Sequence, residues 1–522
     1  MNGLTTKKRL ILTLLSVVLL SIGWLGVTGI TLLAALVPLM IISEHYGSSR
    51  RDWWRMCGWA TLTFLLWNMA TIWWVWIATP AGPIAAGIVG TFWNLVAFMG
   101  YHYVSKRAPR ALAYTLLVTL WIATEYAYNS AEVMTFPWLL LGNGFSGDIW
   151  AVQWYEYTGI FGGTLWVMLS NVAIFEFLRT RTKRAKVRAA LISLLPIFLS
   201  VAIYFSYTPS SKRTTIAVVQ PNVACYESEK ISSAELNELV AQVPEGVSFI
   251  LLPESAMSYV GDNVVSSFDQ ASMLLYKPLF EGIMQGRGDE AKLISGASTA
   301  KYYGKKRGSA TARHNDIYGY YDLFNSALLV TPEGVVEQIY DKGKLVIGVE
   351  AIPDFINAVI DLGGIAGQLG WGKQHIVFEN CGVKIGPSIC YEGLYGDYFA
   401  GFVREGAEVM ALISNDGWWG NTPGHKRLFD FSKLRAIECR RAIARSANTG
   451  ISGFISARGD VVGPTLEWDE QGVLTAELEL RDDVTFYVRY GDIVARWAVY
   501  IAMLSVLYYI SYRTRRRNHI VE

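Results

Sequence analysis

Hydrophobic residues gather in two parts of the chain, about the first 208 residues and again residues 493–512. Within these parts, apolar runs of about 20 residues alternate with short polar segments, and a helix of that length crosses a bilayer core about 30 Å thick. The pattern predicts eight membrane-spanning helices, of which two short ones form a hairpin in the first range. The predicted spans cover residues 10–42, 56–79, 84–104, 111–128, 159–178, 189–207 and 493–512.

Lysine and arginine residues fall on one side of these predicted spans. Neither residue occurs in the short loops on the other side, which are residues 26–29, 80–83 and 129–158. Positively charged loops stay in the cytoplasm, so both termini are expected there. The prediction is therefore a transmembrane domain of seven spans, an extracytoplasmic domain, and a last span with a basic cytoplasmic tail, over residues 1–208, 209–492 and 493–522 respectively.

The middle of the chain alternates short β-prone runs with helical stretches. Its clearest apolar runs lie at residues 215–219, 248–252, 292–298, 326–330, 383–389, 407–413, 451–456 and 473–480. A helix is predicted over about residues 424–446, where apolar side chains repeat at three-residue spacing, at Leu428, Phe431, Leu434 and Ile437. Many short buried strands with intervening helices indicate an α/β sandwich in which helices cover sheets.

Cys390 directly follows one of these predicted strands and precedes Tyr391, Glu392 and Gly393. A thiol at the end of a buried strand, where the chain turns sharply, is well placed to act as a nucleophile. The alternative is that Cys390 only fills the core, as free cysteines usually do. Glu254 and Lys342 also follow β-prone runs, although singly the first could be a helix cap and the second a solvated lysine.

Composition narrows the class of protein. Of the 522 residues, 52% are hydrophobic and 17% are charged, which is unusual for a soluble chain. The formal net charge of +2 and the lack of a basic, aromatic-rich patch give no support for a nucleic-acid partner. Five cysteines without a CxxC pair and six histidines without an HExxH motif predict neither a metal site nor a disulfide framework. We expect no cofactor, and we expect a monomer.

Five motifs occur in order along the chain: LLPESA at 251–256, YDKGKLV at 340–346, SICYE at 388–392, ISNDGW at 413–418 and RSANTG at 445–450. With these motifs the middle of the chain resembles the nitrilase, or carbon-nitrogen hydrolase, superfamily. With the flanking spans, the whole chain resembles the membrane-embedded apolipoprotein N-acyltransferase family. The resemblance implies an αββα sandwich beside the helical membrane bundle.

The resemblance also implies roles for particular residues. Glu254 is implied as the base, Lys342 as the catalytic lysine and Cys390 as the nucleophile, with Glu350, Glu392 and Tyr391 as supporting residues. The chain departs from the family pattern at Ile347, where a proline is common. It departs again at Leu428, where the family often has the histidine of a glutamine–histidine pair.

The activity that the resemblance implies is the last step of bacterial lipoprotein maturation. A fatty acyl chain passes from a membrane phospholipid, through a thioester on Cys390, to the N-terminal amine of diacylglyceryl-cysteine on an apolipoprotein. The expected location is the bacterial inner membrane, with the catalytic domain on the periplasmic face. An alternative is a membrane-anchored amidase or nitrilase, since the same three residues serve that reaction; a catalytically silent binding protein or transporter is a third possibility.

Two segments of the middle domain are candidate lids over a lipid substrate. Residues 351–372 are apolar and glycine-rich and include Phe355 and Trp371, and Trp418 and Trp419 lie between two glycines. Ordinary core packing is the alternative for both segments. As lids, they would dip into the outer leaflet and exclude water from the thioester.

Overall fold

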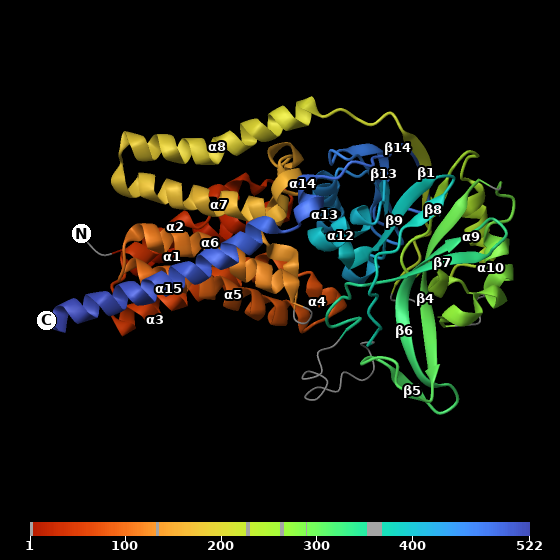
Figure 1. Cartoon of the computed structure of the whole chain (residues 1–522), viewed down its shortest axis with the longest axis horizontal. Coiled ribbons are helices and arrows are strands. Elements are labelled where there is room, and N and C mark those ends of the chain that lie inside the picture. The colour runs from red at the N-terminus through yellow and green to blue at the C-terminus, as the bar shows by residue number, and fades with distance from the viewer. Residues whose placement is uncertain are drawn as a thin grey trace. The chain divides into compact units, whose positions relative to one another are not determined.

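The computed structural model describes residues 4–131, 135–225, 230–261, 266–288, 290–351 and 368–521 (Figure 1). The chain divides into two compact units. The helical unit comprises Met1–Ser206 and Tyr490–Glu522, and the sandwich unit comprises Tyr207–Arg489.

Helices lie over every predicted span of the helical unit. The long helices are α1 Thr6–Ser21, α3 Arg50–Ile72, α5 Gly82–Ser105, α6 Arg110–Ser130, α7 Tyr155–Thr180, α8 Lys183–Ser206 and α15 Ile493–Val521. The short helices are α2 Val37–Glu44 and α4 Val75–Ala78. Turns of 3₁₀ helix are η1 Ile22–Leu25, η2 Gly29–Ala34, η3 Pro137–Leu139, η4 Leu141–Phe145 and η5 Ile149–Ala151.

Five helices in the described residues are long and apolar enough to cross a membrane. They cover Thr6–Leu25, Gly82–Ser105, Tyr155–Thr180, Lys183–Ser206 and Ile493–Arg516, and the apolar stretch Gly29–Glu44 is shorter. This confirms a helical region with several apolar helices. The total of eight spans stays a prediction, because α3 and α6 are not among these five helices.

Polar side chains hold the irregular backbone of the helical unit. Between η2 and α2, Asn171 of α7 accepts from Leu36 N at 2.7 Å and donates to Leu32 O at 2.7 Å. The carboxylate of Glu125 in α6 accepts from Leu141 N at 2.9 Å and from Thr164 Oγ1 at 2.6 Å. Backbone N–H and C=O groups that water does not reach need hydrogen-bond partners inside the protein. The side chains of Asn171 and Glu125 supply such partners here.

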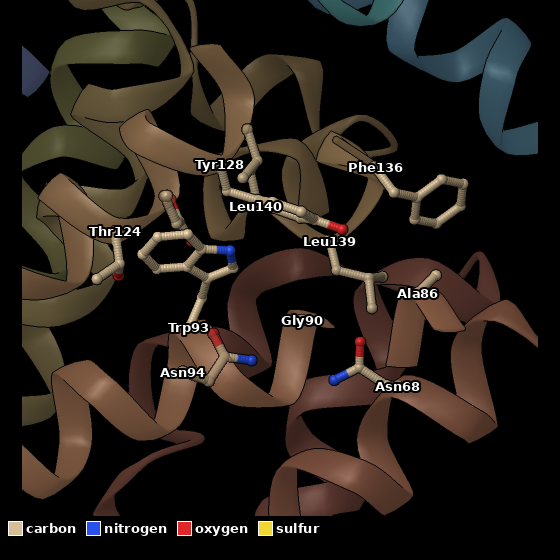
Figure 2. Close-up of a pocket in the computed structure, with 11 residues that line it drawn as sticks. Asn68, Ala86, Gly90, Trp93, Asn94, Thr124, Tyr128, Phe136, Leu139 and Leu140 are labelled. Atoms are coloured by element: carbon tan, nitrogen blue, oxygen red, sulfur yellow. The ribbon is translucent and has the colours of Figure 1, made fainter. Parts of the chain in front are cut away.

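Glu125 also borders a pocket of about 30 Å³ in the helical unit. Figure 2 shows the amides of Asn68 and Asn94 and the ring of Trp93 around this space. A pocket of that volume has room for about two water molecules, so it is too small for a lipid headgroup.

The sandwich unit contains two β-sheets in the described residues. The first sheet has the order β14-β1-β2-β4-β6-β5, with β3 paired to β4 and β7 paired to β6. Its strands are β1 Arg213–Gln220, β2 Phe249–Leu251, β3 Phe268–Asp269, β4 Lys292–Gly304, β5 Arg313–Asn315, β6 Gly319–Val330, β7 Val336–Asp341 and β14 Gly472–Glu479. The second has the order β13-β12-β11-β10-β9-β8, with β8 Phe378–Asn380, β9 Val383–Ile389, β10 Val409–Ser414, β11 Ile443–Ala447, β12 Ser452–Ile455 and β13 Val461–Leu466.

Helices cover the outer face of each sheet (Figure 1). On the first sheet, apolar residues of α9 Ser233–Ala241 and α10 Lys277–Ile283 share one buried cluster with strand residues such as Ile250, Leu293 and Leu328. Beside the second sheet lie α12 Gly396–Arg404 and α13 Pro423–Cys439, and the unit ends in α14 Phe486–Tyr490. The sheets face each other, since Ser446 Oγ of β11 donates to Val219 O of β1 at 2.8 Å. The predicted four-layer α/β sandwich is confirmed.

The predicted helix over residues 424–446 is shorter in the structure. α13 ends at Cys439 because Arg440 adopts a left-handed conformation, with φ of +48°, and the chain then enters β11. A left-handed residue ends a helix, although glycine takes this position more often than arginine does.

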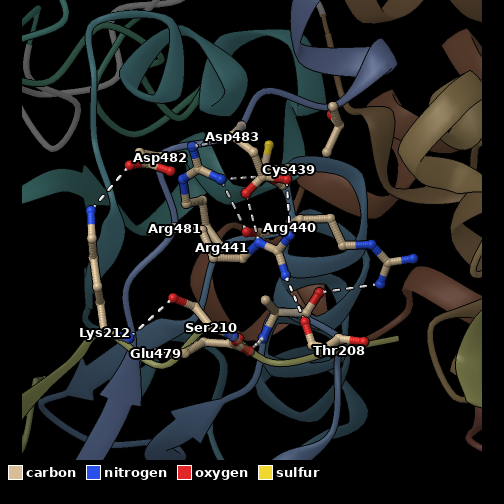
Figure 3. Close-up of polar contacts among 12 residues, drawn as sticks. Thr208, Ser210, Lys212, Cys439, Arg440, Arg441, Glu479, Arg481, Asp482 and Asp483 are labelled. Atoms are coloured by element: carbon tan, nitrogen blue, oxygen red, sulfur yellow. Dashed lines mark hydrogen bonds and ion pairs between the residues drawn. The ribbon is translucent and has the colours of Figure 1, made fainter. Parts of the chain in front are cut away.

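The first and last segments of the sandwich unit are joined to each other. β1 and β14 pair antiparallel along their whole length, from Arg213 opposite Glu479 to Gln220 opposite Gly472. A polar cluster extends this contact (Figure 3): Lys212 Nζ lies 3.1 Å from Asp482 Oδ2, and Arg441 Nη2 donates to Asp483 O at 2.8 Å.

Candidate active site

Cys390 lies directly after β9, at a sharp turn. Its backbone is left-handed, with φ of +48°, and its side chain is 5% exposed. This conformation is strained for a residue with a side chain, and such strain is concentrated at functional sites. The Glu392 carboxylate holds the turn, since Glu392 Oε2 accepts from Ile389 N at 2.7 Å.

Glu254 and Lys342 meet at the ends of strands in the first sheet. Lys342 Nζ donates to Glu254 Oε1 at 2.8 Å and to Glu350 Oε1 at 3.0 Å. The Lys342 side chain is 1% exposed, so its charge is compensated inside the protein by these two carboxylates. In the described part of the chain, Lys342 Nζ donates hydrogen bonds to these two carboxylates. An ammonium has three N–H bonds, so one remains for a substrate oxygen.

Close packing of the backbone brings Glu254 to this position. Gly296 of β4 lies against residues 253–255, and a Cβ at Gly296 would come within 2.6 Å of Glu254 Cα. Any side chain there would force the backbone around Glu254 to shift. The backbone N–H of Asn415, after β10, donates to Glu254 Oε2 at 3.0 Å and holds the other side of the carboxylate.

Glu350 reaches the lysine through a tight turn. Glu350 Oε2 accepts from Val346 N at 2.8 Å, and Gly348 inside the turn has φ of +89°. Ile347, where the family often has a proline, therefore does not prevent Glu350 from pairing with Lys342. Leu428, at the other departure from the family, is buried in α13 as a packing residue.

Asn325 of β6 belongs to this cluster, and the sequence interpretation missed it. Its Nδ2 donates to Glu254 Oε1 at 2.7 Å and to Glu350 Oε1 at 2.8 Å. A polar residue next to the apolar run at 326–330 is the only local signal for it. The pairing of β6 with β7, which places Asn325 beside Lys342, is a non-local fact.

Burial and neighbouring charges set the resting protonation states. Burial favours neutral Lys342, but the carboxylates of Glu254 and Glu350 outweigh it and raise the pKa of Lys342 well above its ordinary value. Burial, reinforced by the Glu254 carboxylate, raises the pKa of Cys390 well above its ordinary value, although the Lys342 ammonium opposes the shift. The resting site therefore holds an ammonium and a protonated thiol.

Glu392 connects the turn at Cys390 with the turn at Lys342. Glu392 Oε1 accepts from Tyr340 Oη at 2.6 Å and from Gly343 N at 2.7 Å. Burial raises the pKa of Glu392 to about 7, although these hydrogen bonds oppose the shift. Its neighbour Tyr391 is buried, with its ring 5.5 Å from the ring of Tyr395. Both residues lie in the turn that carries Cys390.

The fourth and fifth motifs meet in a buried ion pair. Arg445 Nη2 lies 2.8 Å from Asp416 Oδ2, and neither side chain is exposed. Ser414 Oγ also donates to Asp416 Oδ1, at 2.6 Å. The pair joins the segment after β10 to the middle of β11 and fixes the loop that carries Asn415.

The candidate lid residues lie in different surroundings. Trp418 is 38% exposed and Trp419 is partly buried, both in η9 Gly417–Trp419. Trp371 lines a cavity of about 590 Å³ together with Asp322 and Lys373, and Cys390 is not among the described residues that line it. Phe355 lies outside the described residues. Lid movement stays a prediction for all four.

Comparisons with known proteins identify the family of this chain. Residues 215–483, which include Glu254, Lys342 and Cys390, match the carbon-nitrogen hydrolase family, and residues 11–173 match the apolipoprotein N-acyltransferase N-terminal domain. An apolipoprotein N-acyltransferase of Chlorobaculum tepidum is 29% identical over 505 residues, covering 91% of this chain and 90% of that protein. One of Geobacter metallireducens is 25% identical over 458 residues, covering 83% and 82%.

A solved structure of a CN-hydrolase superfamily protein from Xanthomonas campestris covers 51% of this chain and 90% of its own, with 16% identity and a TM-score of 0.35. The carbon-nitrogen hydrolase match extends over more than half of the sequence. The chain belongs to the carbon-nitrogen hydrolase family, in the branch that carries the apolipoprotein N-acyltransferase N-terminal domain.

Proposed function

We propose that this protein transfers a fatty acyl chain from a membrane phospholipid to the N-terminal amine of a diacylglyceryl-cysteine on an apolipoprotein. One observation carries the proposal: a buried ammonium, Lys342, shared by Glu254 and Glu350 in the same cluster as a thiol on a strained turn. The relatives named apolipoprotein N-acyltransferase align with nearly the whole chain and support the choice of reaction.

The first half-reaction forms a thioester on Cys390. Glu254 takes the thiol proton while Sγ attacks the ester carbonyl of the phospholipid, since the protonated thiol is a poor nucleophile. The free N–H of Lys342 and the backbone N–H that follows Cys390 stabilise the oxyanion. The ester C–O bond then breaks, and the alcohol of the lysophospholipid leaves with the proton from Glu254.

The second half-reaction consumes the thioester. The neutral α-amine of the acceptor attacks the thioester carbonyl, and Glu254 takes the proton that the amine must lose. The C–S bond breaks, an amide forms, and the sulfur regains a proton to restore Cys390. Glu254 acts as base in both halves, so no further titratable group is required.

The apolar helices support a lipid substrate. Both the acyl donor and the lipidated acceptor reside in a bilayer, and a catalytic unit anchored by helices meets them at the surface. The charge pattern favours the bacterial inner membrane with the sandwich unit on the periplasmic side. In this setting Trp418 and Trp419 would close over the acyl chain and exclude water.

Mass spectrometry of the full-length protein in phospholipid vesicles tests the proposal. We expect an acyl adduct on Cys390 that is lost when a diacylated lipopeptide is added and N-acylated. Cys390→Ala should form no adduct, and Cys390→Ser should form a slowly resolved oxygen ester. Hydrolysis of small amides without any acyl adduct would instead favour the membrane-anchored amidase and contradict the proposal.

A further inference from the structure

Asn325 lies within the catalytic cluster although it cannot titrate. Its Nδ2 donates to Glu254 Oε1 and Glu350 Oε1 at 2.7 and 2.8 Å. Lys342 Nζ donates to the same two oxygens at 2.8 and 3.0 Å. These two oxygens, Glu254 Oε1 and Glu350 Oε1, therefore each accept one hydrogen bond from a charged donor and one from a neutral donor. Lys342 and Asn325 thus each bridge the two carboxylates.

The neighbours of Asn325 fix the orientation of its amide. Turning the amide over would set Oδ1 against two carboxylate oxygens, which are also acceptors, so Nδ2 must face the carboxylates. Asn325 Oδ1 is then buried and has no hydrogen-bond partner in the described part of the chain. An unpaired buried carbonyl lowers stability, and natural proteins keep such atoms mainly at functional sites. The Asn325 side chain is thus placed to donate hydrogen bonds to the two carboxylates rather than to pack β6.

We propose that Asn325 is a positioning residue that holds Glu254 and Glu350 together on the Lys342 ammonium, so that Glu254 stays in place to take the proton of Cys390. Two carboxylates close together repel each other, and a neutral donor that bridges them offsets this repulsion without adding charge. Without Asn325, Lys342 is the one remaining donor that bridges the two carboxylates in the described residues, and Glu254 is held less firmly toward the thiol. The inference rests on the proposed roles of Glu254 and Cys390.

The charged and titratable groups that act on this cluster come from segments after strands, from the turn that carries Glu350 and from a short 3₁₀ helix, Ala256–Tyr259. They are Glu254, Lys342, Glu350, Cys390, Asp416 and Tyr259. A direct readout of proton removal is the rate at which iodoacetamide alkylates Cys390, followed by mass spectrometry of the Cys390 peptide from the full-length protein. This reagent needs no phospholipid, so it tests the cluster separately from the proposed function.

Three variants separate positioning from structural support. Asn325→Ala should slow both alkylation and thioester formation at least about tenfold. Asn325→Asp should be slower still near pH 8, by about a hundredfold, because it adds a third carboxylate to one ammonium. The two neighbouring carboxylates favour protonation of the new carboxyl group as the pH falls toward about 5, and the protonated group can donate as the amide does. The rate of Asn325→Asp relative to wild type should therefore rise at least about tenfold from about pH 8 to about pH 5. Ser326→Ala is the matched control, because Ser326 Oγ bonds to Thr299 and Asp341 instead, and its rate should stay within about threefold of wild type.

Two results would overturn the inference. One is an Asn325→Ala protein that is alkylated within about threefold of the wild-type rate. The other is an Asn325→Asp protein whose rate relative to wild type stays constant between about pH 5 and about pH 8, since a merely structural loss has no such pH dependence. If wild type forms no acyl adduct but alkylation follows the expected pattern, the proposed function fails and the role of Asn325 stands.

Discussion

Lys342 Nζ lies 2.8 Å from Glu254 Oε1, and both side chains are almost completely buried. A buried ion pair adds little net stability, because the loss of hydration offsets the attraction between the charges. Its effect is on protonation: the lysine stays an ammonium, while the nearby thiol of Cys390 keeps its proton at rest. At rest the thiol is therefore a weak nucleophile, and it becomes reactive when Glu254 takes its proton.

Replacing Glu254 with glutamine should abolish most of the chemistry but not the fold. Glutamine keeps the size of the side chain and an oxygen for Lys342 Nζ, but it cannot take a proton. We expect acylation of Cys390 to slow by about 10²–10⁴-fold, the usual contribution of a general base. Time courses of the acyl adduct measure the rate, and circular dichroism checks the fold. A rate within about threefold of wild type would mean that another group removes the proton.

Glu392 should make the stability of the sandwich unit depend on pH. Burial raises its pKa to about 7, so the folded protein binds this proton more tightly than the unfolded chain does. The resulting stabilisation is complete below the unfolded pKa, near 4.5, and is lost as the pH rises through about 7. Glu392→Gln cannot ionise, so its Tm should fall less than the wild-type Tm between about pH 5 and about pH 8. Equal falls in the two proteins would contradict this assignment.

The Asp416–Arg445 ion pair should be essential for stability. Arg445→Met leaves the Asp416 carboxylate buried without its cation, and breaking one side of a buried pair costs about 3–5 kcal/mol. Urea denaturation followed by tryptophan fluorescence measures this loss. The double variant Asp416→Asn with Arg445→Met removes both charges and should recover part of it. No recovery would indicate that Arg445 acts mainly through its hydrogen bond to Ile451 O.

Trp418 and Trp419 provide a test of the lid hypothesis. Trp418 is exposed enough to be truncated without leaving a core cavity. If the loop excludes water from the thioester, Trp418→Ala with Trp419→Ala should shorten the lifetime of the acyl adduct on Cys390 and reduce phospholipid turnover, each about tenfold. Val461→Ala, at another exposed position, is the control. Unchanged turnover and lifetime would show that the loop is not a lid.

The sequence predicts site residues that follow strands better than site residues that lie within strands. Cys390, Glu254 and Lys342 each come after a β-prone run, and the structure places them after β9 of the second sheet and after β2 and β7 of the first. Asn325 lies inside β6, where only the non-local pairing with β7 reveals that it faces the carboxylates. Likewise, the contact between Glu392 and Tyr340 joins two sheets, and no local pattern predicts which side chains meet there.

The sequence likewise predicts where helices lie better than where they end or which distant residues stabilise a break between them. Apolar periodicity predicts that a helix covers Leu428–Ile437, but it does not predict the left-handed residue Arg440 that ends the helix. In the helical unit, the break near Gly29 is visible in the sequence as two glycines. The hydrogen bonds that stabilise it come from Asp148, more than a hundred residues away. Composition alone does not contain that information.

The antiparallel pairing of β1 with β14 has a consequence for biosynthesis. β1 is the first strand of its sheet to leave the ribosome, and its partner β14 is the last. Until residue 479 has been translated, one edge of β1 has no neighbour, and an unpaired edge invites association with other chains. We therefore expect the nascent chain to need protection from aggregation during its synthesis, until its final strand completes the sheet just ahead of the last helix.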